Sequence, residues 1–195
     1  SSDLDVAELR FLGDVLTDNQ TFSVEDVITS HDRIKTRDMT LDRRTGRFHA
    51  DGPGWIISTR LDTGGIINNV PGRATVRSGN STGTQSRANR LIYVRVDYQN
   101  EIEGNIDNRE AVLQHYVQVV YGPVTAWDQT LDPNQQGGLG PQGIVMTCQR
   151  LFLRETGQGA QRGIELSAVG DTLVEGATFT ARAQRFTYVQ AKDLL

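Results

Sequence analysis

The feature that most constrains the fold is a nine-residue segment that recurs four times, at residues 34–42, 86–94, 146–154 and 181–189. Small or apolar side chains occupy its first and third places, polar ones its fourth and fifth, and large apolar ones its sixth and eighth. Strict alternation would put the third and sixth places on opposite faces of a strand, so the pattern slips by one residue. This slip predicts a β-bulge that bends the strand while both halves keep their apolar groups on one face, an order that no helical stripe produces.

A short apolar segment with a central glycine precedes each copy, around Gly13, Gly72, Gly122 and Gly176. The repeating unit is therefore predicted to be a glycine-kinked strand followed by a bulged strand. Such a unit cannot bury its apolar face alone, so neighbouring units must stack and share one elongated core. We expect an all-β fold: a repeat-built antiparallel β-jelly-roll, or twisted two-sheet sandwich, with solenoid-like stacking of strands.

The rest of the chain agrees with many short strands. The 20 glycines fall between segments rich in Val, Ile, Thr, Tyr and Phe. Alternating apolar residues from Ala111 to Tyr121 predict another strand, against the alternative of a short helix that starts at Asp107. Residues 62–85 and 128–143 are Gly-rich insertions dense in turn formers and are predicted to be loops. We expect one domain over residues 1–195, cut from a longer protein.

Composition and motifs argue against several classes of function. The net charge of −4 comes from scattered charges of both signs, so no nucleic-acid partner is expected, and no apolar run is long enough for a membrane-spanning segment. Cys148 falls at a small inward place of the third copy and is predicted to be a buried, inert thiol. His31, His49 and His115 are spread over separate strands, and neither a nucleophile elbow nor a metal-ligand run is present. We therefore expect no enzyme, no cofactor and no metal.

The repeat resembles a known family. Its frame is apolar-Gly-x-apolar, a gap, Ala-x-x-apolar-x-Tyr, then a turn and a glycine-bearing return strand, as at Ala88–Tyr93 and Ala183–Tyr188. This is similar to the recurring unit of the organic-solvent-tolerance (OstA), or LptA-type, family of lipopolysaccharide-transport proteins. Across the chain, the four copies carry the resemblance together.

The resemblance implies a non-catalytic domain of the periplasm or cell envelope that binds or conveys an amphipathic lipid such as lipopolysaccharide, or that forms a structural segment of such a conduit. It also implies end-to-end self-association through open edge strands, with β-augmentation as the physical basis. Carried over by position, the interior lipid-binding residues would be Met39, Leu41, Phe48, Leu91, Tyr93, Leu151, Leu153, Phe186 and Tyr188.

Three alternatives stay open, and one of them is an assembly module that binds no ligand and associates end to end. For each interior aromatic residue, ordinary core packing competes with lipid contact. In a different class of function, the chain could be a jelly-roll carbohydrate-binding or carbohydrate-active module whose exposed Trp55 and Trp127 stack on sugar rings.

Overall fold

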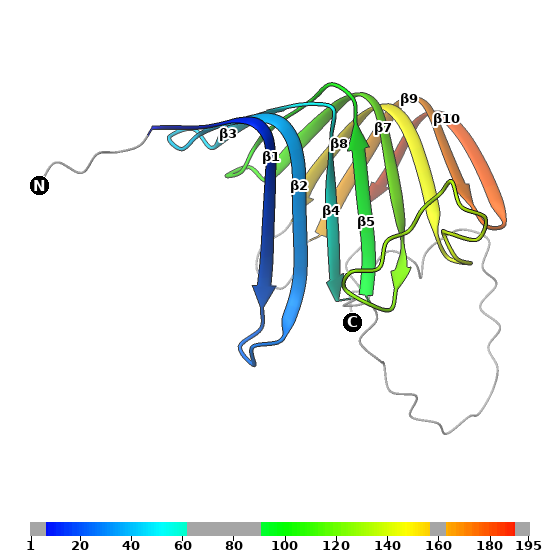
Figure 1. Ribbon diagram of the computed structural model, residues 1–195. Coiled ribbons are helices and arrows are strands. Elements are labelled where there is room, and N and C mark those ends of the chain that lie inside the picture. Colours follow the sequence, from blue (N-terminus) through cyan, green and yellow to red (C-terminus); the bar gives the residue numbers. More distant parts are fainter. Residues whose placement is uncertain (1–6, 62–90, 157–162, 190–195) are drawn as a thin grey trace, which may run out of the picture.

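The computed structural model describes residues 7–61, 91–156 and 163–189, and every regular element in these ranges is a β-strand (Figure 1). The prediction of an all-β, jelly-roll-like fold is thereby confirmed. The strands are β1 (Glu8–Phe22), β2 (Ile28–Asp42), β3 (Arg47–Asp51), β4 (Gly54–Leu61), β5 (Leu91–Tyr98), β6 (Glu101–Asn105), β7 (Glu110–Val124), β8 (Ile144–Thr156), β9 (Gly163–Gly176) and β10 (Phe179–Val189).

All ten strands belong to one antiparallel sheet, so the two layers of the fold are limbs of a single bent sheet. β2 pairs with β4 through its first half and with β3 through its second half. β7 pairs likewise with β6 and then with β5. Therefore β3 followed by β4, and β5 followed by β6, each take the place of one long bent strand in the middle of the sheet.

The bend crosses every long strand near its middle, where Figure 1 shows the strands arching over. One strand of each outer pair carries an extra residue there: Gly13–Asp14 in β1 stand opposite a single residue of β2, and Gly170–Asp171 in β9 stand opposite a single residue of β10. All four have positive φ, between 42° and 83°, which is the left-handed region. In β7 the corresponding pair is His115–Tyr116, also with positive φ.

The predicted phase slip is therefore present, with a correction to where the extra residue lies. In the third copy, Cys148 and Leu151 both belong to the buried interior although three positions separate them. The bulge itself is in β1, β7 and β9, and the repeat segments in β2, β8 and β10 run opposite to it. Each repeat strand changes phase because its partner contributes the additional residue.

The limb that contains β3 and β6 and the limb that contains β4 and β5 bury one apolar cluster between them. We call this set the interior cluster. Its buried members are Ala50, Val96, Tyr98, Ile102, Leu113, Val117, Val119, Met146, Cys148, Leu151, Ala168 and Val174. Cross-strand pairs such as Ile102 with Leu113 and Leu113 with Leu151 carry the cluster from strand to strand.

A second cluster, here the outer cluster, lies on the other face of the β4/β5 limb. It consists of Ile57, Leu91, Tyr93, Val120, Val124, Leu131 and Val145, with Trp55, Leu61, Trp127 and Leu139 packed around it. Leu131 and Leu139 belong to the segment 128–143, which has turns and no strand, as predicted. This loop therefore covers apolar surface that would otherwise face water.

The predicted strand from Ala111 to Tyr121 is confirmed as part of β7, but one other local prediction needs correction. Of the glycines expected to kink strands, Gly13 lies at the bend. Gly122 lies within β7, away from its bulge, and Gly176 is the last residue of β9. The glycine at the bend of β9 is instead Gly170. Gly72 and the insertion 62–85 lie outside the described residues. Residues 106–109 form the turn between β6 and β7, so the alternative short helix is absent there.

Candidate functional site

Seven of the nine predicted interior residues lie on the face of the interior cluster. Leu151 is a fully buried member, and Met39, Phe48 and Leu153 pack against it. The other three follow from register, because residues directly opposite in a sheet share a face: Leu41 pairs with Phe48, Phe186 with Ala168, and Tyr188 with Leu166.

Leu91 and Tyr93 were predicted wrongly as interior residues. Both are buried, at 4% and 0% exposure, but they belong to the outer cluster. The second copy is not equivalent to the others, because β5 begins at Leu91 and lies wholly on one side of the bend. Its inward residues are instead Val94, Val96 and Tyr98.

The interior is closed in the middle and open at both edges of the sheet. Leu113, Val117 and Leu151 in the central strands are fully buried. Among the described residues, β1 pairs only with β2 and β10 only with β9, and at these edges Phe11 is 46% exposed and Phe186 37% exposed. The apolar face therefore continues to two edge strands, each paired on one side only in the described part of the chain, and reaches solvent there.

The tryptophans proposed for sugar stacking are not free on the surface. Trp55 and Trp127 are half-buried and pack against the outer cluster. The Arg95 guanidinium also lies 6.0 Å from the centre of the Trp55 ring, within the range of a cation–π contact. This packing does not favour the carbohydrate alternative.

Cys148 lies inside the interior cluster at 3% exposure. Burial raises the pKa of its thiol to about 11, because desolvation disfavours the thiolate. At neutral pH the group is thus a neutral thiol, as expected for a residue that packs.

A groove of about 870 Å³ runs along the β3/β6 limb, away from the bend. Polar side chains of seven strands line most of it, including Arg47, His49, Glu103 and Arg154, and Phe152 supplies apolar surface. The groove and the interior cluster are largely separate features, since most of these groups point outward from the sheet.

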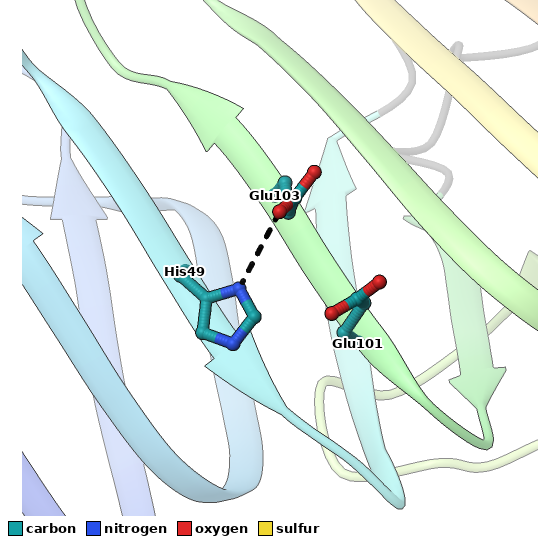
Figure 2. Close-up of side chains that lie close together, drawn as sticks. All are labelled: His49, Glu101 and Glu103. Carbon is teal, nitrogen blue, oxygen red and sulfur yellow. Dashed lines mark ion pairs between the residues drawn. The ribbon is translucent and has the colours of Figure 1, made fainter.

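Two residues of the groove wall, His49 and Glu103, belong with Glu101 to a cluster of ligand-type side chains that the sequence patterns did not predict. His49 on β3 stands opposite Glu103 on β6, and Asp51 stands opposite Glu101. One ligand atom from each of His49, Glu101 and Glu103 lies within 4.8 Å of the others. Figure 2 shows the imidazole beside the two carboxylates, with His49 Nδ1 3.9 Å from Glu103 Oε1.

A weak signal for this cluster exists in the sequence. His49-x-Asp51 and Glu101-x-Glu103 each place two ligand-type residues on one face of a strand, since side chains alternate along it. What the sequence does not contain is the register of β3 against β6, which are separated by some fifty residues along the chain.

Comparisons with protein-family models, with curated proteins and with solved structures find no match to this chain. Among the described residues there is also no helix of the length and apolar character needed to cross a bilayer.

Proposed function

We propose that this chain is a non-catalytic segment of a cell-envelope conduit that binds or conveys an amphipathic lipid such as lipopolysaccharide. One observation carries the proposal: the apolar face between the two limbs continues to both edge strands, where Phe11 and Phe186 reach solvent. Exposed apolar surface of this kind is typical of a surface that binds lipid or another protein.

Acyl chains would enter at the edges. The central residues of the interior cluster contact one another and leave no exposed surface there, whereas Phe186 and Tyr188 on β10 lie at the open end of the same face. A lipid tail laid along β10 would cover these rings and remove apolar area from water, worth roughly 25 cal/mol for each Å² buried.

Site-specific photocrosslinking tests this proposal. A photoreactive phenylalanine analogue at Phe186 should form an adduct with purified lipopolysaccharide, detected as a mass shift after irradiation. The same analogue at Tyr116, which is 55% exposed at the bend, is the matched control and should form none. Equal labelling at the two positions, or none at Phe186, would contradict lipid binding in the interior.

A further inference from the structure

Independently of the proposed function, we propose that His49, Glu101 and Glu103 bind a divalent transition-metal ion such as Zn²⁺ on the outer face of the β3/β6 limb. The three side chains come from two paired strands, so backbone hydrogen bonds fix their relative positions.

The distances fit such an ion after a small adjustment. Zinc binds imidazole nitrogen and carboxylate oxygen at about 2.0–2.2 Å, which places tetrahedral ligands about 3.4 Å from one another. The three ligand atoms lie within 4.8 Å of one another, and the side chains are half-buried or exposed. Rotation of the two glutamates is therefore enough to close the site.

The position of the imidazole between two carboxylates also suits a metal ligand. His49 Nε2 lies 3.2 Å from Asp51 Oδ1, within hydrogen-bond distance. When a neutral imidazole donates its Nε2–H to Asp51, the lone pair on Nδ1 faces Glu103, 3.9 Å away and beyond hydrogen-bond reach. Two acceptors then face each other across a gap, which a cation would bridge. A carboxylate behind a histidine ligand is the usual support at metal sites, so Asp51 is a positioning residue.

The local charge also favours a cation. Asp38 stands opposite Asp51, and Asp51 stands opposite Glu101, so three carboxylates follow one another across adjacent strands. Like charges directly opposite in a sheet are destabilising. Among the described residues, no lysine or arginine forms an ion pair with Asp51, Glu101 or Glu103. A bound dication would offset this repulsion.

The ligand types select the ion. Imidazole suits zinc, copper and nickel, whereas Mg²⁺ and Ca²⁺ prefer sites made of oxygen alone. The remaining coordination positions would face the groove, where water can complete the shell.

Calorimetric titration of the full chain with Zn²⁺, and visible absorption after Co²⁺ addition, test the site. The wild type should bind one equivalent, with a Co²⁺ spectrum typical of four- or five-coordination. His49→Ala and Glu103→Gln should each lower the affinity at least about 10-fold, and Asp51→Asn should lower it about 10- to 100-fold while one equivalent still binds.

His31→Ala is the matched control, because His31 Nε2 pairs with a single carboxylate, Asp18, at 2.8 Å and belongs to no such cluster. This variant should bind zinc like the wild type. Circular dichroism confirms that each variant is folded. Absence of binding to the wild type, or undiminished binding to both folded variants His49→Ala and Glu103→Gln, would overturn the proposal.

Discussion

Cys148 illustrates what a single interior residue does in this fold. It sits in β8 at the bend, with Val117 of β7 directly opposite. Its neighbours are apolar, so its thiolate has no compensating charge, and the pKa of about 11 follows from that burial.

The first prediction at this scale concerns reactivity. At about pH 8 only about one molecule in a thousand carries the thiolate if the pKa is about 11, so iodoacetamide should leave folded protein unmodified while urea-unfolded protein reacts within minutes. Mass spectrometry after a timed quench measures the difference. Fast alkylation of the folded chain would contradict the buried position.

The raised pKa of Cys148 also determines how the free energy of unfolding changes with pH. A folded-state pKa raised above the ordinary value means that folded protein holds the proton more tightly than unfolded protein does. The stability that the protonated thiol contributes is fully present below about pH 9 and is lost as the pH rises to about 11. Cys148→Ala should therefore reduce the loss of stability over that range, measured as the shift of the urea midpoint between its two ends.

At the scale of elements, the bend is the main feature, because it turns one sheet into two packed layers. β1 and β9 use Gly-Asp at the bulge, whereas β7 uses His115–Tyr116 with φ of 58° and 54°. A residue with a β-carbon is strained in the left-handed region by roughly 1–2 kcal/mol, which glycine avoids. β7 therefore carries strain that β1 and β9 reduce with one glycine each.

Replacement of His115 by glycine should relieve this strain and raise the free energy of unfolding by about 1 kcal/mol, less the entropy that glycine adds to the unfolded chain. Urea denaturation measures the change. Gln149→Gly is the control, because Gln149 lies in β8 opposite the bulge, and it should lower stability by about 0.5–1 kcal/mol. A destabilised His115→Gly variant would show that the imidazole makes contacts worth more than the strain.

Much of this element-level structure could be predicted from the sequence. The strands follow from alternation, and the phase slip and six of the seven interior residues follow from the shared frame of the four copies, because that frame departs from alternation at the same place each time. The face of Leu91 and Tyr93 could not be predicted in this way, since it depends on where the bend crosses β5 and β6, between Tyr98 and Glu101. The His115–Tyr116 bulge lacks the glycine that would have marked it.

At the scale of the whole molecule, the two edge strands are complementary. β1 carries three acids, Glu8, Asp14 and Asp18, against Arg10 alone, whereas β10 carries Arg182 and Arg185 and no acid. The strand directions also allow pairing, because β1 and β10 run in opposite directions within one molecule. If a second copy lies beside β10 in the same orientation, its β1 is antiparallel to β10 of the first copy. We propose that copies of the chain associate end to end through these edges.

Charge reversal at the basic edge tests this association. Sedimentation velocity should show species that grow with protein concentration and shrink with added salt, because exposed charges are screened. Arg182→Glu/Arg185→Glu should leave a monomer. Arg150→Glu/Arg154→Glu makes the same charge change on β8, which has a partner strand on both sides, and this variant should still associate. A wild type that stays monomeric, or a control pair that fails equally, would contradict edge pairing.

The bulges at the bend also bear on how such a domain changes length. Outside the composite middle strands, a bulged strand always lies beside an unbulged one: β1 beside β2, β7 beside β8, and β9 beside β10. Each hairpin therefore contains both kinds of strand that the bend needs. Duplication of a hairpin adds one bulged and one unbulged strand, so the bend continues in line along the sheet. Gain of a single strand would place two bulged or two unbulged strands side by side and shift the bend out of line. The domain can thus grow or shrink in evolution two strands at a time.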